Sequence, residues 1–146
     1  MTWNDWLKDG RIEAHAPARG EIAAQRRAAE RSLADAALSG LSPEGRFRFA
    51  YDAGLALATI AVLASGHRVK SRVGHHQVTI EAAGLALGKE AAAIIQYLEL
   101  CRRTRNVISY EGDEIGEGHA NELLKEVTRL AEFVDAWLAK HHPKLV

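Results

Sequence analysis

The feature that most constrains the fold is the segment from Pro43 to about Ala64, which is apolar nearly all round when drawn as a helix. Its start carries a helix-initiation pattern, with Ser42 as N-cap, proline at the first helical position and Glu44 in the first turn. A helix without a polar face is buried on most sides. We therefore predict that this helix is the centre of the fold and that other helices pack around it.

The rest of the chain predicts further helices and no strands. The expected segments are a short helix at 2–8 followed by the connector 11–19, then helices over 20–38, 77–87, 89–111 and 119–140. Trp3 and Trp6 are three residues apart and share a face, so the first helix is expected to lie on the body of the protein. We predict an all-α bundle forming one domain over 1–146, with an N-terminal arm at 1–19 and the bundle at 20–140.

Composition limits the functional classes. The chain has 19 Lys and Arg against 19 Asp and Glu, so the formal charge is zero and any anion-binding site must be local. The single cysteine, Cys101, excludes an intramolecular disulfide and lies on an apolar arc that predicts a buried thiol. No signal peptide is recognised, and the longest apolar run, 53–64, is shorter than the roughly 20 residues that a bilayer requires. We expect a cytoplasmic protein that is not inserted in a membrane.

Polar chemistry is concentrated at the end of the helix predicted over 89–111. At roughly 100° per residue, one arc carries Arg102, Arg103, Arg105, Asn106, Ser109 and Tyr110, and the other carries Tyr97, Leu100, Cys101, Thr104, Val107 and Ile108. Arginine suits anion binding because its planar fork offers fixed donors and keeps its charge. Alternatively, the helix dipole and a stop at Gly112 account for the cations without any ligand.

A second cationic segment, 66–76, precedes the helix predicted at 77–87. It combines two arginines, a lysine and three histidines, and it contains no acid. The histidine pair at its end falls near a helix N-terminus, where unpaired backbone N–H groups favour anions. The alternative is an exposed, solvated loop. No cysteine or carboxylate stands at ligand spacing nearby, so the sequence predicts no metal and no cofactor. The candidate ligands for phosphate are Lys70, Arg72, His75 and His76.

The same 89–111 helix bears on assembly. In its first half, Ala91, Ala92, Ile95 and Leu98 share the arc that later carries the arginines. A face that is first apolar and then cationic predicts burial against a second copy of the chain. Alternatively, the chain's own last helix covers this face. The loop that follows carries Asp113, Glu114 and Glu117, and these acids could pair with the arginines and block the site.

The motif from Arg105 to Tyr110, at the end of the penultimate helix of an Ala-rich bundle, resembles the HEPN superfamily (higher eukaryote and prokaryote nucleotide-binding domains). Ala50-Tyr51-Asp52 and Gly74-His75-His76 are similar to segments of bacterial HEPN-domain proteins, and the resemblance spans roughly 29–138. It implies an up-and-down bundle of four to five main helices. It also implies a symmetric homodimer with an RNA- or nucleotide-binding cleft at the interface, and a nucleotidyltransferase or antitoxin partner in a toxin–antitoxin or defence system.

Many members of this superfamily are metal-independent ribonucleases whose motif is Arg, a polar residue and, several positions later, His. Arg105 and Asn106 match it, whereas Tyr110 stands where His is expected. Tyrosine, with a pKa near 10, is a poorer base at neutral pH than histidine, near 6.5. The implied catalytic residues are Arg105, Asn106, Tyr110 and His76, and the implied binding residues are Arg102, Arg103, His75, Arg72 and Lys70.

Three hypotheses follow from these residues. The first, favoured because Tyr110 replaces the histidine, is a dimeric RNA- or nucleotide-binding protein, accessory to a nucleotidyltransferase or a toxin–antitoxin system. The second is an active metal-independent endoribonuclease in which His75 or His76 supplies the imidazole. The third is a structural helical dimer without a ligand.

Overall fold

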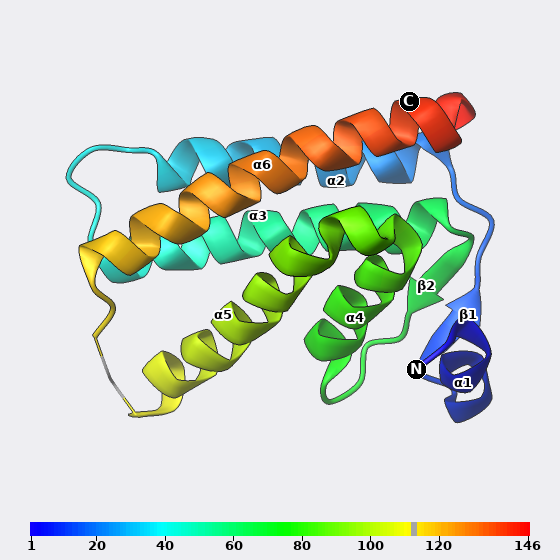
Figure 1. Cartoon of the computed structure of the whole chain (residues 1–146), viewed down its shortest axis with the longest axis horizontal. Helices are drawn as coiled ribbons and strands as arrows, with labels where there is room; N and C mark the ends of the chain where they lie inside the picture. The colour runs from blue at the N-terminus through cyan, green and yellow to red at the C-terminus, as the bar shows by residue number, and fades with distance from the viewer. Residues whose placement is uncertain (112–113) are drawn as a thin grey trace.

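The computed structural model describes residues 1–111 and 114–146, and the side chains of 1–107 and 114–146. The elements in chain order are α1 (Trp3–Asp9), β1 (Ile12–Ala14), α2 (Arg19–Ala36), α3 (Pro43–Ala64), β2 (His67–Val69), α4 (His75–Leu87), η1 (Lys89–Ala91), α5 (Ala92–Glu111), α6 (Glu117–His141) and η2 (Pro143–Leu145) (Figure 1). The chain is 76% helical, so the prediction of an all-α bundle is confirmed.

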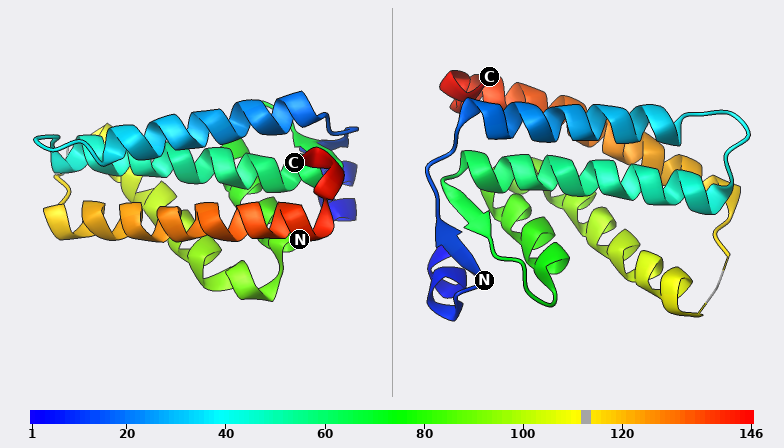
Figure 2. Two further views of the ribbon diagram at one scale, coloured as in Figure 1. Left: turned by 90° about the horizontal axis from the view of Figure 1, so that it is seen from above. Right: turned by 180° about the vertical axis from the view of Figure 1, so that it is seen from behind.

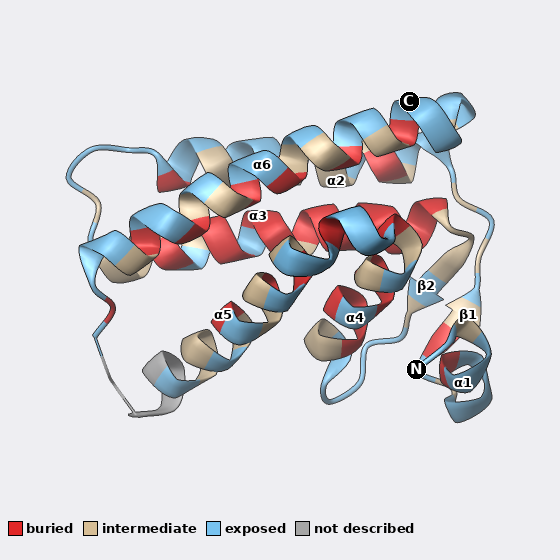
Figure 3. Cartoon of the chain, in the orientation of Figure 1, coloured by how far each residue is buried: buried red, intermediate tan, exposed pale blue. Residues whose placement is uncertain are grey.

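Helix α3 is the centre of the fold, as predicted. It packs between α2 and α6 on one side and α4 and α5 on the other (Figures 1 and 2). From Ala56 to Ala64, every residue except Thr59 is buried, which appears as the red band in Figure 3. The predicted cap is present, because Ser42 Oγ accepts a hydrogen bond from the Gly45 N–H at 3.0 Å. By length and composition α3 could cross a membrane, but as the core helix it is largely covered by the rest of the bundle.

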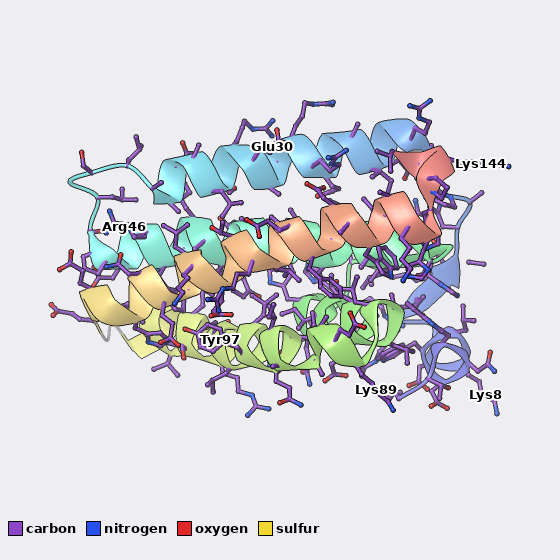
Figure 4. The ribbon with its side chains drawn as sticks, turned by 45° about the horizontal axis from the view of Figure 1, so that its top comes forward. Lys8, Glu30, Arg46, Lys89, Tyr97 and Lys144 are labelled. Atoms are coloured by element: carbon purple, nitrogen blue, oxygen red, sulfur yellow. The ribbon has the colours of Figure 1, made fainter. Side chains whose placement is uncertain are left out.

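Charged side chains lie mainly at the periphery of this bundle. Glu30 on α2, Lys89 in η1 and Lys144 in η2 are exposed and project away from the ribbon (Figure 4). Clusters of charged groups that are half-buried are therefore departures from the general pattern, and the candidate site contains such a cluster.

The N-terminal arm is held to the body by a two-stranded sheet that the sequence did not predict. Helix α1 is capped by Thr2, whose hydroxyl accepts a hydrogen bond from the Asp5 N–H, and it ends at Gly10, whose φ is 72°. Beyond it, β1 pairs antiparallel with β2, with Ile12 opposite Val69 and Ala14 opposite His67. Strands of three residues are too short to give a readable alternation, so neither the connector nor the cationic loop indicated them.

Two glycines let α5 pack closely against α3 and α4. A Cβ added at Gly54 would lie 2.8 Å from Leu98 Cδ1, and one added at Gly84 would lie 3.0 Å from Ile95 Cγ2. Both α5 side chains are buried within the chain, with exposed fractions of 1% for Leu98 and 8% for Ile95. Of the apolar arc that suggested a second copy, Ala91, Ile95 and Leu98 are therefore covered within the chain and only Ala92 is exposed, so this arc does not support a dimer.

Candidate functional site

Two of the three arginines of α5, Arg102 and Arg105, lie on the face of the helix that packs against the rest of the chain. Ala91, Ile95 and Leu98 form a buried stripe at helical spacing, and Arg102 and Arg105 continue it as half-buried residues. Leu100 and Val107, by contrast, are 55% and 41% exposed. A helical wheel gives the angles between side chains but does not say which face packs. Part of the arc expected to be buried therefore faces solvent, although Cys101 is buried as predicted.

Arg105 and Tyr51 form the centre of the candidate site. Arg105 Cζ lies 5.3 Å from the centroid of the Tyr51 ring, within the range of a cation–π contact. Arg105 Nε and Tyr51 Oη are both buried, and neither has a hydrogen-bond partner among the residues that the structure describes. Burial raises the pKa of Tyr51 to about 12, although Arg105 and Arg102 act in the opposite direction. The phenol therefore stays protonated and can donate a hydrogen bond.

His76 joins this pair from the first turn of α4. Its ring centroid lies 6.3 Å from that of Tyr51 and 4.4 Å from that of His75, which it meets edge-on. Helix α4 begins at His75, two residues earlier than predicted, after Gly74 in a left-handed conformation. Burial, then the neighbouring His75 and Arg105, lower the pKa of His76 below its ordinary value near 6.5. The imidazole is therefore neutral at neutral pH.

An open pocket of about 420 Å³ lies beside His76, between α2, α3 and α4. Asp52, which follows Tyr51 on α3, is exposed at its rim, and burial among its neighbours raises the pKa of its carboxyl against the opposing effect of Arg105. The other polar lining residues are Gln25, Ser32, Thr59, His75 and Thr79. The sequence did not single out Tyr51 or Asp52 as site residues, and their only signal was the Ala50-Tyr51-Asp52 segment of the family resemblance.

Arg102 and Arg103 are engaged by Glu99, one turn earlier on α5. Arg102 donates from Nε at 2.9 Å and from Nη2 at 2.8 Å to the two carboxylate oxygens. Both side chains of this pair are about five-sixths buried, with exposed fractions of 17% and 16%. Arg103 Nε is 3.6 Å from the same carboxylate, and its side chain is 68% exposed. Glu99 thus neutralises much of this charge, and Arg105 has no ion pair within the described part of the chain.

The predicted loop ligands lie in a second pocket of about 570 Å³. Lys70, Arg72 and His75 line it together with Arg11, which the sequence did not single out. Arg72 Nη1 donates to the Gly10 carbonyl at 3.1 Å, so this residue also holds the N-terminal arm in place. His75 lines both pockets, which connects the loop to His76.

The remaining predicted site residues, and the acidic residues that could block the site, form no hydrogen bond or ion pair with the cluster among the described side chains. Asn106 is half-buried on α5, and the side chain of Tyr110 lies outside the described residues, as does Asp113. Glu114 and Glu117 are exposed, and neither forms an ion pair with any of the α5 arginines whose side chains are described. No group of three His, Cys, Asp or Glu side chains in the described regions is placed to hold a metal ion.

The chemistry of the cluster suits an anion rich in hydrogen-bond acceptors. Arg105 and the Tyr51 hydroxyl offer unpaired donors, and the neutral imidazole of His76 can donate from one nitrogen and accept at the other. No family model, no curated protein and no solved structure matches this chain.

Proposed function

We propose that the protein binds the phosphate groups of RNA or of a nucleotide at a site formed by Tyr51, His76 and Arg105. The observation that carries this proposal is that Arg105 Nε and Tyr51 Oη are both buried without hydrogen-bond partners among the described residues, with Arg105 Cζ 5.3 Å from the Tyr51 ring centroid. An unpaired buried donor costs about 1–3 kcal/mol of stability. A phosphate group would remove this cost, because its oxygens accept hydrogen bonds from both donors.

The residues that carry the HEPN resemblance support the same proposal. Tyr51-Asp52 on α3, His75-His76 on α4 and Arg105 on α5 are separated in sequence but are neighbours in the fold. Asp52, His75 and His76 line a pocket whose volume is in the range usual for small-ligand sites, about 300–1,000 Å³. Its polar lining offers partners for a ribose or a base next to the bound phosphate.

We further propose that the protein is a homodimer that associates through the outer face of α5. Leu100 and Val107 are seven residues apart on this face, and both are exposed, as is Leu85 on α4. Exposed apolar residues at this spacing suit a helix pair. Light scattering at micromolar concentration should give twice the chain mass, and the double variant Leu100→Glu, Val107→Glu should give the mass of the monomer.

An accessory role beside a nucleotidyltransferase or antitoxin belongs to the same proposal, and co-purification with the product of a neighbouring gene tests it.

The binding site can be tested with labelled single-stranded RNA at low salt in excess chelator. Arg105→Met keeps the apolar stem over the Tyr51 ring and removes the guanidinium, so we expect the dissociation constant to rise at least about tenfold, the effect of one charged hydrogen bond. Arg27→Met is the matched control, because this arginine on α2 is exposed and lines neither pocket. Equal losses in the two variants would contradict the proposed site. Absence of binding by the unaltered protein would favour the structural dimer.

A second function, metal-independent RNA cleavage, is favoured by the position of His76. A neutral imidazole beside Arg105 is suited to take the proton from a ribose 2′-hydroxyl while the guanidinium stabilises the charge that develops on the phosphate. Total RNA incubated with the protein and excess chelator tests this function. If cleavage occurs, His76→Gln should lower its rate by about 10²–10⁴-fold, the cost of removing a general base, and this loss should far exceed any loss of RNA affinity. If no cleavage occurs, the binding function stands alone.

A further inference from the structure

We infer that the pocket between the N-terminal arm and the 70–75 loop is a second phosphate subsite, with Arg11, Lys70 and Arg72 as its cations. This inference rests on the proposed function and makes it more specific. A ligand that reaches both subsites must carry several phosphates, so the substrate class is single-stranded RNA rather than a mononucleotide.

The second subsite is built by contacts between distant parts of the chain. The Lys70 N–H donates to the Arg11 carbonyl at 2.9 Å, next to the pairing of β1 with β2, and this places the two cationic residues side by side. Arg72 reaches the same wall, because its Nη1 donates to the carbonyls of Gly10 at 3.1 Å and Asp9 at 3.4 Å. The resulting pocket has a volume of about 570 Å³.

The charges that line this pocket are predominantly positive. Arg11, Lys70, Arg72 and His75 line it, with the carboxylate of Asp9 as the one acidic group in the lining. Glu13 lies outside the lining and is bonded to Arg68, with Lys70 Nζ at the longer distance of 3.8 Å. Arg72 uses one nitrogen of its guanidinium for the two carbonyls, which leaves its other N–H donors for a ligand. Arg11 has no ion pair in the part of the chain that the structure describes.

The two subsites are connected by a short series of rings. His75 lines the 570 Å³ pocket and meets His76, with 4.4 Å between the ring centroids. His76 lies 6.3 Å from the Tyr51 ring, which in turn lies 5.3 Å from Arg105 Cζ. Donor groups therefore follow one another from Arg105 to Arg11, which suits the successive phosphates of a polynucleotide. A single phosphate occupies only one end of this path.

The test compares two probes, uridine 5′-monophosphate and an oligouridylate of roughly ten nucleotides, within the site sizes known for single-strand binders. Arg11→Ala and the milder Arg11→Gln should each weaken oligouridylate binding about fivefold or more. They should also lower the slope of log K against log[salt] by about 0.7, the value for one lost single-strand phosphate contact. Neither should change the affinity for the monophosphate. Arg27→Ala, at an exposed arginine on α2 outside both pockets, is the matched control.

Arg105→Met separates this inference from the proposed function. We expect Arg105→Met to weaken the binding of both probes and Arg11→Ala to weaken only the binding of the oligouridylate. If Arg105→Met weakens both probes but the Arg11 variants match Arg27→Ala in affinity and salt slope, the second subsite is wrong and the proposed function stands. If Arg105→Met changes neither probe, or the unaltered protein binds neither, the proposed function fails and the second subsite fails with it.

Discussion

Replacing Tyr51 by phenylalanine should stabilise the unliganded protein and weaken its anion site. The side chain is fully buried, and its hydroxyl has no hydrogen-bond partner among the described residues. An unpaired buried polar group costs about 1–3 kcal/mol, and the ring that remains keeps its packing. Allowing for the small void left by the oxygen, the free energy of unfolding should rise by about 1–2 kcal/mol. For a chain of this size that is a rise in Tm of about 2–8 °C.

The same substitution should raise the dissociation constant for single-stranded RNA. A hydrogen bond to a charged group is worth about 1.5–3 kcal/mol, so the loss of the Tyr51 donor to a phosphate corresponds to roughly 10- to 150-fold weaker binding. Urea denaturation of the unliganded protein gives the first quantity, and fluorescence anisotropy with labelled RNA gives the second. The opposite signs of the two effects distinguish a ligand-binding tyrosine from one that only supports the fold.

Tyr97→Phe is the control, because the Tyr97 hydroxyl is also buried without a hydrogen-bond partner in the described regions. It lies on α5 near the Cys101 thiol, which is at most a weak acceptor. This variant should leave RNA affinity unchanged while its stability stays equal or rises. A loss of stability in Tyr51→Phe would mean that the Tyr51 hydroxyl is bonded, and the reasoning would be refuted. A gain in stability without weaker binding would remove Tyr51 from the site.

Three other measurements test separate parts of the structure. Burial and the adjacent His75 hold the pKa of His76 low, so the unfolded state protonates this imidazole more readily and the free energy of unfolding should fall as pH drops below about 6.5. Urea titrations should show a smaller fall with pH for His76→Gln, and the same pH dependence in both proteins would contradict the prediction. Burial raises the pKa of Cys101 to about 11, so at mildly alkaline pH the folded protein holds almost no thiolate. A thiol-reactive dye should therefore label the protein only in urea, and labelling of the folded protein would show that the thiol is accessible. Gly54→Ala would bring a Cβ to 2.8 Å from Leu98 Cδ1. The overpacking should cost about 1–3 kcal/mol, more than the gain of about 0.5–1 kcal/mol from helix propensity, and should lower Tm. A higher Tm would show that the Leu98 side chain moves to make room.

The sequence by itself determined the elements whose signals are local. The cap at Ser42 was readable because it is a contact between residues three positions apart. The bounds of α3 and its burial followed from an apolar surface that no exposed helix can carry. The buried state of Cys101 was also predicted, although Leu100 and Val107 on the same arc are exposed. The resemblance to the HEPN superfamily stays a prediction from the sequence.

Only the tertiary structure decided which face of α5 packs inward and which residues meet there. Periodicity gives angles within one helix, whereas the orientation of that helix depends on Gly54 and Gly84, which let α5 approach α3 and α4. Orienting α5 in this way carries Arg105 over Tyr51 and leaves Leu100 exposed.

Long-range pairing had a similar effect at the N-terminal arm. Arg11 and Lys70 become neighbours through a backbone hydrogen bond beside two three-residue strands, and strands this short carry no pattern that a sequence reveals. Both parts of the candidate binding surface therefore depend on contacts between segments far apart in the chain. Local sequence signals do not encode such contacts, because they arise from the packing of whole elements against one another.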